Sequence, residues 1–269
     1  MQIGFSVNEI LCLLSLASGA CWLAWRRRLR RQPPPERKPL WVTLGAELFV
    51  VIALMFTCRV ALADWPKVPS GSMEPTLRVG DYLLVNHLAY GPRLPFTNTA
   101  IETGQPQRGD VVVFRFPLDV SEFYVKRLIG LPGDVVRFQN GVVSVNGEPF
   151  SAEMVSDGTG DGVPAEDRGQ WLQRETVQQR QHQIKLNPFV LGRLPLNVKQ
   201  PGLAQNCSVE ASAVWQCTVP AGQYLMLGDN RDNSEDSRVW GFLPHEQVYG
   251  KAVRVLFNLS DMSRSWTAL

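Results

Sequence analysis

The stretch VPSGSMEPTL, from Val68 to Leu77, contains two serines that could act as nucleophiles. A serine that attacks a carbonyl needs a base to take its proton. Histidine is the usual base, but the three histidines of this chain lie in a strand-like run, a glutamine-rich stretch and a turn, and none belongs to a motif. An SGS turn is most often a solvated loop. A catalytic role for one of these serines therefore depends on finding another base.

Lysine can serve as that base when its surroundings lower its pKa, and Lys126 is the best candidate. A free lysine has a pKa of about 10.4, so only about one in 2,500 is neutral at pH 7, but burial lowers that pKa by several units. Lys126 lies in the apolar run EFYVKRLIGLPGD. Strand alternation places it on the face of Tyr124 and Leu128, which we take as interior, and Arg127 on the other face. The alternative is an edge-strand lysine that opposes aggregation.

The third candidate segment is LGDNRDNSEDSRVWGF, residues 227–242, whose polar residues lie between apolar runs. Asp236 and Arg238 can pair, and the Ser234 hydroxyl can bond a neighbouring amine. A long Asx-rich turn is the alternative interpretation. The density of Asp, Asn and Arg favours a structured turn network.

The elements that would position these residues have strand signals. Short runs rich in Val, Leu, Phe and Tyr are separated by Gly-Asp, Pro-Gly and Asn-Gly pairs. The run QNGVVSVNGEPF predicts a hairpin with a type I′ turn at Asn140-Gly141. We predict a mostly β fold: a curled or barrel-like antiparallel catalytic domain, residues 64–150 and 218–260, to which the last two strand-like pieces return.

Residues 151–217 are predicted to form a smaller inserted lobe, since much of this segment is polar and then Gln-rich with weak strand signals. Cys207 and Cys217 lie near its end. Outside the cytoplasm such a pair can form a disulfide. A metal site would need further Cys or His nearby, and none is present. We therefore predict that these two cysteines are joined.

The N-terminal part has two apolar runs of roughly 20 residues, enough for a helix to cross about 30 Å of hydrocarbon. We predict a first transmembrane helix at 1–25, a basic cytoplasmic loop at 26–40 and a second transmembrane helix at 41–63. The loop RRRLRRQPPPERKP places both chain ends outside. A cleaved signal peptide would need positive charge before the first run, and Arg26 is the first basic residue. A nucleic-acid patch is another interpretation of the basic cluster. The net charge of +2 argues neither for nor against nucleic acid as a partner.

These segments together resemble the bacterial type I signal peptidases, membrane-bound serine proteases. PSGSMEPTL, GDYLLV, KRLIGLPGD and GDNRDNSEDSRVWGF occur in the family's order. The similar regions are 66–90, 109–150 and 222–252. The insertion and the far C-terminus carry no matching signal.

The resemblance implies a role for each matching position. Ser72 matches the nucleophile and Lys126 the general base, and the amide of Ser72 and the hydroxyl of Ser70 match the oxyanion hole. Ser234 matches the hydroxyl that orients the lysine, and Asp236 and Arg238 match a supporting ion pair. Glu235 stands at a variable position, and Val239 stands where the family often has an aromatic residue. We expect neither to touch the chemistry.

The resemblance also implies cleavage after small residues in an A-x-A-like pattern. Eight residues resemble positions that line shallow substrate pockets, with core packing as the alternative for each: Val68, Pro69, Met73, Leu77, Leu83, Val113, Tyr124 and Val125. The expected partners are signal peptides of preproteins and membrane lipid, near the secretion translocon, without nucleic acid. No metal or organic cofactor is expected, and the location is the bacterial inner membrane with the catalytic domain on the periplasmic side.

Two other functions fit parts of the sequence. A self-cleaving Ser-Lys protein related to repressor-type proteases would use the same residue pair, but the two apolar runs and the lack of a DNA-binding helix pair argue against it. A catalytically inactive membrane-anchored binding module predicts loss of Ser72 or Lys126, and both are present.

Overall fold

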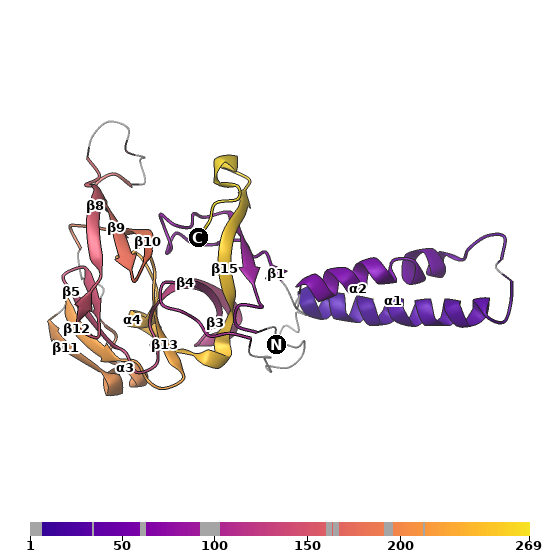
Figure 1. Ribbon diagram of the computed structural model, residues 1–269, viewed down its shortest axis with the longest axis horizontal. Coiled ribbons are helices and arrows are strands. Elements are labelled where there is room, and N and C mark those ends of the chain that lie inside the picture. Colours follow the sequence, from indigo (N-terminus) through magenta and orange to yellow (C-terminus); the bar gives the residue numbers. More distant parts are fainter. Residues whose placement is uncertain are drawn as a thin grey trace.

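The structure is a computed structural model that describes residues 7–33, 35–59, 63–91, 103–159, 163, 167–190, 196–211 and 213–269. At the N-terminus, two helical arms lie side by side and extend away from a β-rich part (Figure 1). The first arm is α1 (Val7–Leu29), and the second consists of a π-helical turn (Val42–Ala46) and α2 (Phe49–Thr57).

These arms differ from the two predicted membrane spans, 1–25 and 41–63. Helix α1 continues to Leu29 and carries Arg26, Arg27 and Arg28 in its last turn. The second arm is not one helix, because the π-helical turn ends at Ala46 and α2 begins at Phe49. No helix in the described part of the chain is both long enough and apolar enough to cross a membrane. The predicted pair of transmembrane helices is therefore not confirmed.

The described residues of the β-rich part form three sheets of antiparallel strands. Its strands, in chain order, are β1 (Ala63–Asp64), β2 (Asp81–Asn86), β3 (Val111–Phe116), β4 (Asp119–Gly130), β5 (Val135–Gln139), β6 (Val142–Val145), β7 (Glu148–Pro149), β8 (Ser151–Ser156), β9 (Trp171–Val177), β10 (Arg180–Leu186), β11 (Cys207–Ala211), β12 (Val214–Thr218), β13 (Gln223–Leu227), β14 (Leu243–Pro244) and β15 (Val248–Asn258). Among the described residues the sheet orders are β1-β2-β15-β3-β4-β13-β14, β11-β12-β5-β6-β7 and β10-β9-β8.

The predicted mostly antiparallel β fold is confirmed. The apolar runs of the sequence form β2, β3, β4, β5, β6, β13 and β15, and the last two return to the largest sheet. The predicted hairpin joins β5 to β6, with Gln139 opposite Val142. Asn140 and Gly141 have φ angles of 48° and 90°, as a type I′ turn requires.

The barrel-like form of the prediction is wrong, because the described strands leave the largest sheet open. Its edge strands β1 and β14 are two residues each and pair only with β2 and β13. Pro244 in β14 has no N–H to donate to a further strand. Short edge strands of this kind end a sheet instead of closing it.

Short helices and 3₁₀ turns complete the β-rich part: α3 (Pro201–Asn206), α4 (Ser237–Trp240), η4 (His245–Gln247) and η5 (Met262–Arg264). Asp236 is the N-cap of α4, and its side chain accepts a hydrogen bond from the Arg238 N–H. Its Trp240 is 1% exposed and packs in the core with residues of β3 and β13. The polar segment 227–242 therefore begins in a strand and ends in a buried helical turn.

The predicted insertion, 151–217, contributes to two sheets. Strands β8, β9 and β10 form the three-stranded sheet. Strand β12 pairs with β5 over five positions, so residues 207–218 share a sheet with 135–149. This second sheet therefore crosses the predicted boundary between the catalytic domain and the lobe.

A disulfide joins Cys207 to Cys217, which lie directly opposite each other in β11 and β12. Cys217 is fully buried in the core between this sheet and the end of the largest one. The half-cystines therefore tie two neighbouring strands together at the place where they meet the core.

We expect the double substitution of Cys207→Ser and Cys217→Ser to lower the free energy of unfolding by roughly 2–3 kcal/mol, since the bond closes a short loop. Urea denaturation measures this change. Preprotein cleavage should continue at a temperature where the variant is folded. Cys58→Ser, which removes a free thiol, serves as the control. Two free thiols at these positions in a non-reduced digest would contradict the pairing.

Candidate active site

Ser72 lies in a tight turn whose apolar residues are fixed in the core. Met73 and Leu77 are 0% exposed and pack with residues of β2, β3 and β15. Within the turn, the Glu74 N–H donates to the Gly71 carbonyl and the Leu77 N–H to the Met73 carbonyl. The turn that presents the Ser72 hydroxyl is therefore held from below by burial and from within by backbone hydrogen bonds.

Lys126 projects from β4 toward this turn. Its Nζ donates a hydrogen bond of 2.6 Å to Ser72 Oγ, and the residue is only 3% exposed. Its Nζ lies 5.4 Å from the centre of the Tyr124 ring, on the same side of the strand. Arg127 points to the other side, as strand alternation predicts, where it binds Asp229 through two nitrogens at 2.8 and 2.6 Å.

Burial lowers the pKa of Lys126 from its ordinary value of 10.5 to about 8, although the negative charges of Asp236, Glu235 and Asp229 act to raise it. Among the described residues, no carboxylate lies within ion-pair distance of Nζ. At this pKa a substantial fraction of the amine is neutral near pH 8. The lone pair needed to remove the Ser72 proton is thus available close to neutral pH.

The segment that follows β13 closes the other side of the turn. The Asn230 N–H donates to the Ser72 carbonyl at 3.1 Å. A Cβ on Gly228 would lie 2.4 Å from the same carbonyl oxygen and 2.1 Å from Ser234 Oγ. The close approach therefore requires glycine at position 228, a role that the sequence analysis did not assign.

The predicted ion pair between Asp236 and Arg238 is present and buried. Two nitrogens of Arg238 donate to the Asp236 carboxylate at 2.8 and 2.7 Å, and Asp236 Oδ2 also accepts from the Gly228 N–H at 3.0 Å. Burial alone would raise the pKa of Asp236, but Arg238 and the Gly228 N–H hold this pKa below its ordinary value. The ionised pair therefore anchors the strand end that faces Ser72.

The two other predicted hydroxyls lie in the site but with different contacts. Ser70 Oγ is 3.4 Å from Ser72 Oγ. Ser234 Oγ is buried and has no hydrogen-bond partner within the described residues. The expected bond from Ser234 to Lys126 is therefore not formed here: the amine is directed at Ser72, while Ser234 packs over Gly228.

A cavity of about 570 Å³ opens in front of Ser72 and Lys126. Its lining residues are Pro69, Ser70, Gly71, Ser72, Glu122, Phe123, Tyr124, Val125, Lys126, Asn233 and Glu235. Of the predicted substrate-binding residues, Pro69, Tyr124 and Val125 are among them. Four further lining residues were not predicted from the sequence, because strand alternation and turn chemistry do not mark them: Gly71, Glu122, Phe123 and Asn233.

The other five predicted substrate-binding residues do not line this cavity. Each is at most 3% exposed and belongs to one core cluster: Val68, Met73, Leu77, Leu83 and Val113. They lie beneath the turn in the core, which fits the core-packing alternative, and this cavity therefore does not confirm a substrate-binding role for them.

Glu235 also requires a correction. We expected it not to touch the chemistry, but it lines the cavity, and its charge acts to raise the pKa of Lys126. The histidines lie elsewhere. His87 contacts the Tyr249 carbonyl, His245 contacts the Tyr224 hydroxyl, and His182 lies 3.1 Å from Glu175. None of the three lines the cavity.

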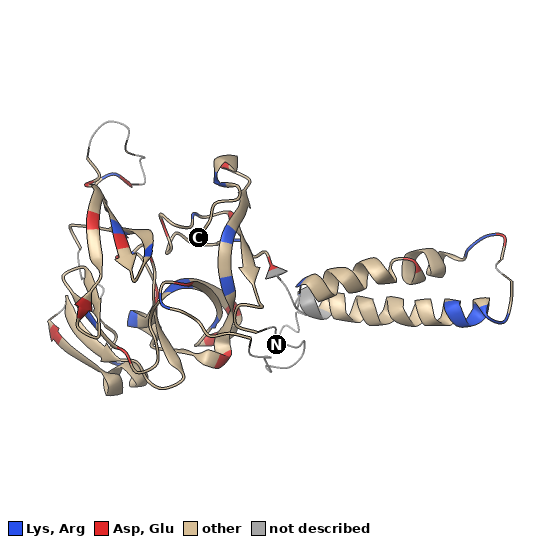
Figure 2. Ribbon diagram, viewed as in Figure 1, with Lys and Arg blue, Asp and Glu red and all other residues tan. Residues whose placement is uncertain are grey.

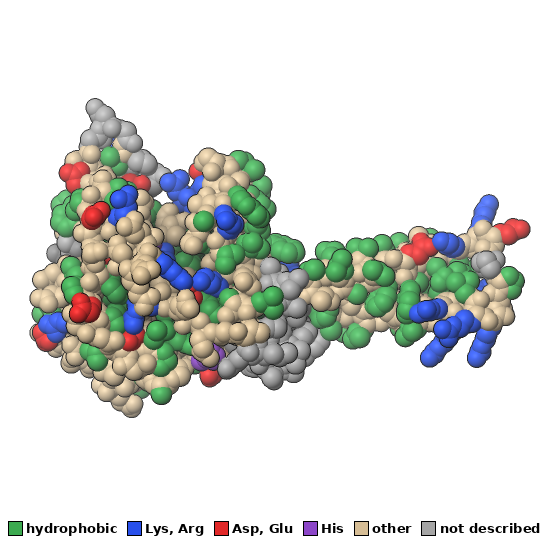
Figure 3. Space-filling model, viewed as in Figure 1, with side chains coloured by type: hydrophobic (Ala, Val, Ile, Leu, Met, Phe, Trp, Pro, Cys, Tyr) green, Lys and Arg blue, Asp and Glu red, His purple; other side chains and the backbone are tan. Residues whose placement is uncertain are grey.

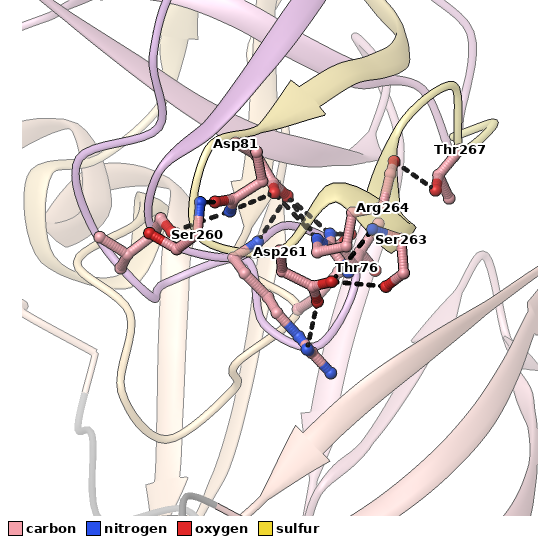
Figure 4. Close-up of polar contacts among 11 residues, drawn as sticks. Thr76, Asp81, Ser260, Asp261, Ser263, Arg264 and Thr267 are labelled. Atoms are coloured by element: carbon pink, nitrogen blue, oxygen red, sulfur yellow. Dashed lines mark hydrogen bonds and ion pairs between the residues drawn. The ribbon is translucent and has the colours of Figure 1, made fainter.

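A C-terminal contact supports the end of the turn. Arg264 donates to both carboxylate oxygens of Asp81 and to the Thr76 carbonyl (Figure 4). The Thr76 hydroxyl in turn donates to Asp229. The segment after β15 therefore packs against the same turn that carries Ser72.

A buried lysine of lowered pKa, hydrogen-bonded to a serine beside an open cavity, is the arrangement of a serine hydrolase with lysine as its base. The signal peptidase family, peptidase S26, matches residues 41–257 of this chain. The chain therefore belongs to this family. As a signal peptidase, it is a serine endopeptidase that acts on the signal peptides of preproteins.

Several characterised proteins are similar over most of the chain. Signal peptidase I of Pseudomonas aeruginosa is 37% identical over 244 residues, 86% of this chain and 77% of its own length. Signal peptidase I of Pseudomonas fluorescens is 38% identical, with 82% of this chain and 74% of its own length covered. Signal peptidase I of Aquifex aeolicus is 33% identical, with 79% of this chain and 82% of its own length covered.

Proposed function

We propose that Ser72 is the nucleophile and Lys126 the general base with which this chain cleaves signal peptides from preproteins. The observation that carries the proposal is the 2.6 Å contact between Lys126 Nζ and Ser72 Oγ in a buried site that opens to a cavity. Neutral Lys126 takes the proton of Ser72 as Oγ attacks the scissile carbonyl. The resulting ammonium protonates the leaving amine, and an acyl-enzyme remains on Ser72.

Deacylation repeats the same proton transfers with water as the nucleophile. Lys126 removes a proton from the water as it attacks the acyl carbon, and Ser72 regains its proton as its oxygen leaves. The oxyanion of each step would be stabilised by the Ser72 N–H and the Ser70 hydroxyl. The position of Ser70 beside Ser72 in the lining of the cavity supports this role.

Ser234 and the pair of Asp236 and Arg238 would act as supporting residues. Within the described residues the buried Ser234 hydroxyl has no hydrogen-bond partner; it lies beside the turn of Ser72 and would bond the lysine amine once Ser72 is acylated. Asp236 of the ion pair accepts from the Gly228 N–H and so holds the strand end against that turn. The positions of these side chains support both roles.

A preference for small residues before the scissile bond, in an A-x-A-like pattern, is proposed from the similarity to the signal peptidases. Pro69, Phe123, Tyr124 and Val125 line the cavity together with Ser72, so a small apolar side chain beside the nucleophile would meet apolar partners. Replacement of the small residues of a preprotein by large ones should therefore reduce cleavage.

The test of this function is cleavage of a labelled preprotein by the purified chain and by Ser72→Ala. We expect the variant to lose about 10⁴-fold or more of the activity, as other serine hydrolases do without their nucleophile. Ser144→Ala, on β6 outside the cavity, should cleave normally. Comparable cleavage by Ser72→Ala would exclude Ser72 as the nucleophile.

We also propose that the helical hairpin anchors the chain in the bacterial inner membrane, in contact with lipid and near the translocon. Both arms carry exposed apolar residues on their outer faces: Ile10, Leu13, Leu14, Leu16, Leu23, Val50, Val51, Leu54 and Met55. Figure 3 shows this apolar surface along the hairpin, and Figure 2 shows basic residues at its far end. A basic tip retained in the cytoplasm would place the β-rich part on the periplasmic side.

In intact spheroplasts, an added protease should cut the chain after Asp64 and leave residues 26–38 untouched. The reason is that basic loops are retained on the cytoplasmic side. Fragment sizes on an immunoblot, with detergent-lysed cells as the control, measure this. Cutting within the basic loop from outside would contradict the orientation.

A further inference from the structure

Strand β10 of the predicted insertion is hydrogen-bonded to the segment that follows β13, next to the turn that carries Ser72. Lys185 of β10 and Asn230 form a parallel bridge. The Lys185 N–H donates to the Asp229 carbonyl at 2.8 Å, and the Arg231 N–H donates to the Lys185 carbonyl at 2.9 Å. The segment 229–231, which we call the support turn, is thus an added strand-like neighbour of β10.

The turn that carries Ser72, residues 70–77, lies on the other side of the support turn, and we call it the serine turn. The Asn230 N–H donates to the Ser72 carbonyl, and the Asn230 side chain donates to the Gly71 carbonyl, both at 3.1 Å. Asn230 is 6% exposed, so water competes little for these bonds. One residue therefore connects β10 on one side to the backbone of the proposed nucleophile on the other.

A buried carboxylate fixes the support turn from the neighbouring strand. Glu175 of β9 is 2% exposed and accepts from two nitrogens of Arg231 at 3.0 and 2.5 Å. His182 lies 3.1 Å from the same carboxylate. Burial acts to raise the pKa of Glu175, but Arg231 and His182 lower it to about 2, so this group is ionised at neutral pH.

A second contact runs from the same sheet to the serine turn. Lys185 Nζ lies 2.7 Å from Asp167 and 3.5 Å from Glu74, which is two residues after Ser72. The three-stranded sheet therefore reaches the serine turn by more than one route. One passes through Glu175, Arg231 and Asn230, and another passes through Lys185 and Glu74. The Thr76 hydroxyl also donates to the Gln183 carbonyl of β10 at 3.4 Å.

We infer that Glu175 is a positioning residue for the proposed nucleophile: through Arg231 it fixes the support turn, which holds the Ser72 backbone at hydrogen-bond distance from Lys126. The inference rests on the proposed function of Ser72. It gives β9 and β10 a part in catalysis without contact to the substrate. Glu175 itself does not line the cavity, so its loss should affect turnover more than substrate binding.

The test compares Glu175→Gln with wild type at a temperature where circular dichroism shows both folded, with rates expressed per folded enzyme. A glutamine cannot neutralise Arg231, so the support turn should shift. We expect kcat to fall by about tenfold to 100-fold, since a displacement of roughly 1 Å at a reacting group can cost about 100-fold. KM should change much less than kcat, because the part of the cavity lining that β4 supplies, from Glu122 to Lys126, is outside the support turn.

Glu153→Gln is the matched control. Glu153 of β8 pairs with Arg174 at 3.8 Å in the same sheet, but it is exposed and has no contact with the support turn. Its kcat and KM should equal those of wild type. A normal kcat in folded Glu175→Gln, or an equal loss in Glu153→Gln, would overturn the inference.

Glu175→Asp decides the question if Glu175→Gln does not fold. Its shorter carboxylate keeps the charge but cannot reach both guanidinium nitrogens from the same backbone position. We expect a loss in kcat that exceeds any change in KM, and a normal kcat would overturn the inference. Ser72→Ala is measured in parallel, and its continued activity would contradict the proposed function instead.

Discussion

Lys126→Arg should abolish preprotein cleavage although it keeps the positive charge. An arginine stays protonated throughout the accessible pH range, so it cannot accept the Ser72 proton. We expect kcat/KM to fall by about 10⁴-fold, in line with loss of the base in other serine hydrolases. Lys126→Met, which removes the charge and keeps the apolar stem, should be equally inactive.

The pH dependence of wild-type kcat/KM provides the second part of this test. Burial lowers the pKa of Lys126 to about 8. The neutral, active form is therefore scarce below that pH and dominant above it: about one tenth of the amine is neutral at pH 7 and about nine tenths at pH 9. Activity should rise about tenfold over this interval, until another group becomes limiting.

His245→Ala is the control for a histidine base. His245 contacts the Tyr224 hydroxyl and lies outside the cavity, so the variant should keep both the rate and the pH profile. His87→Ala should likewise remain active, since its ring packs against Tyr249 instead of facing Ser72. Near-normal turnover by Lys126→Arg would exclude the lysine as the base.

Features that depend on local sequence could be predicted. The alternation of apolar residues around Lys126 placed it on the same side of β4 as Tyr124, and Arg127 on the other. The Asn140-Gly141 pair specified its turn because both residues adopt positive φ readily. These signals are contained in a few neighbouring residues, so no knowledge of the tertiary fold was needed.

Features that depend on tertiary contacts could not be predicted. Val68 and Val125 are both apolar residues near the chemistry, but Val68 is in the core and Val125 lines the cavity. Nothing in the sequence separates these two environments. The contact of Glu175 with Arg231 joins residues 56 positions apart, and only the folded arrangement of β9 beside the support turn reveals it.

Gly228→Ala should be nearly inactive although it adds only one methyl group. That methyl would lie 2.4 Å from the Ser72 carbonyl oxygen and 2.1 Å from Ser234 Oγ, both well inside van der Waals contact. The Gly228 N–H is bonded to buried Asp236, so the strand end cannot move away freely. The serine turn must move instead, which separates Ser72 from Lys126.

We expect kcat to fall by roughly 100-fold, because a displacement of about 1 Å at a reacting group has that effect, and overpacking should lower the free energy of unfolding by about 1–3 kcal/mol. Single-turnover kinetics and urea denaturation measure the two effects separately.

Gly202→Ala in α3 is the control, since the nearest atom to its added methyl, at 3.0 Å, is the end of the flexible Gln200 side chain. That variant should cleave normally. Full activity in folded Gly228→Ala would mean that the serine turn tolerates displacement, and that the contact of Lys126 with Ser72 does not depend on the segment after β13.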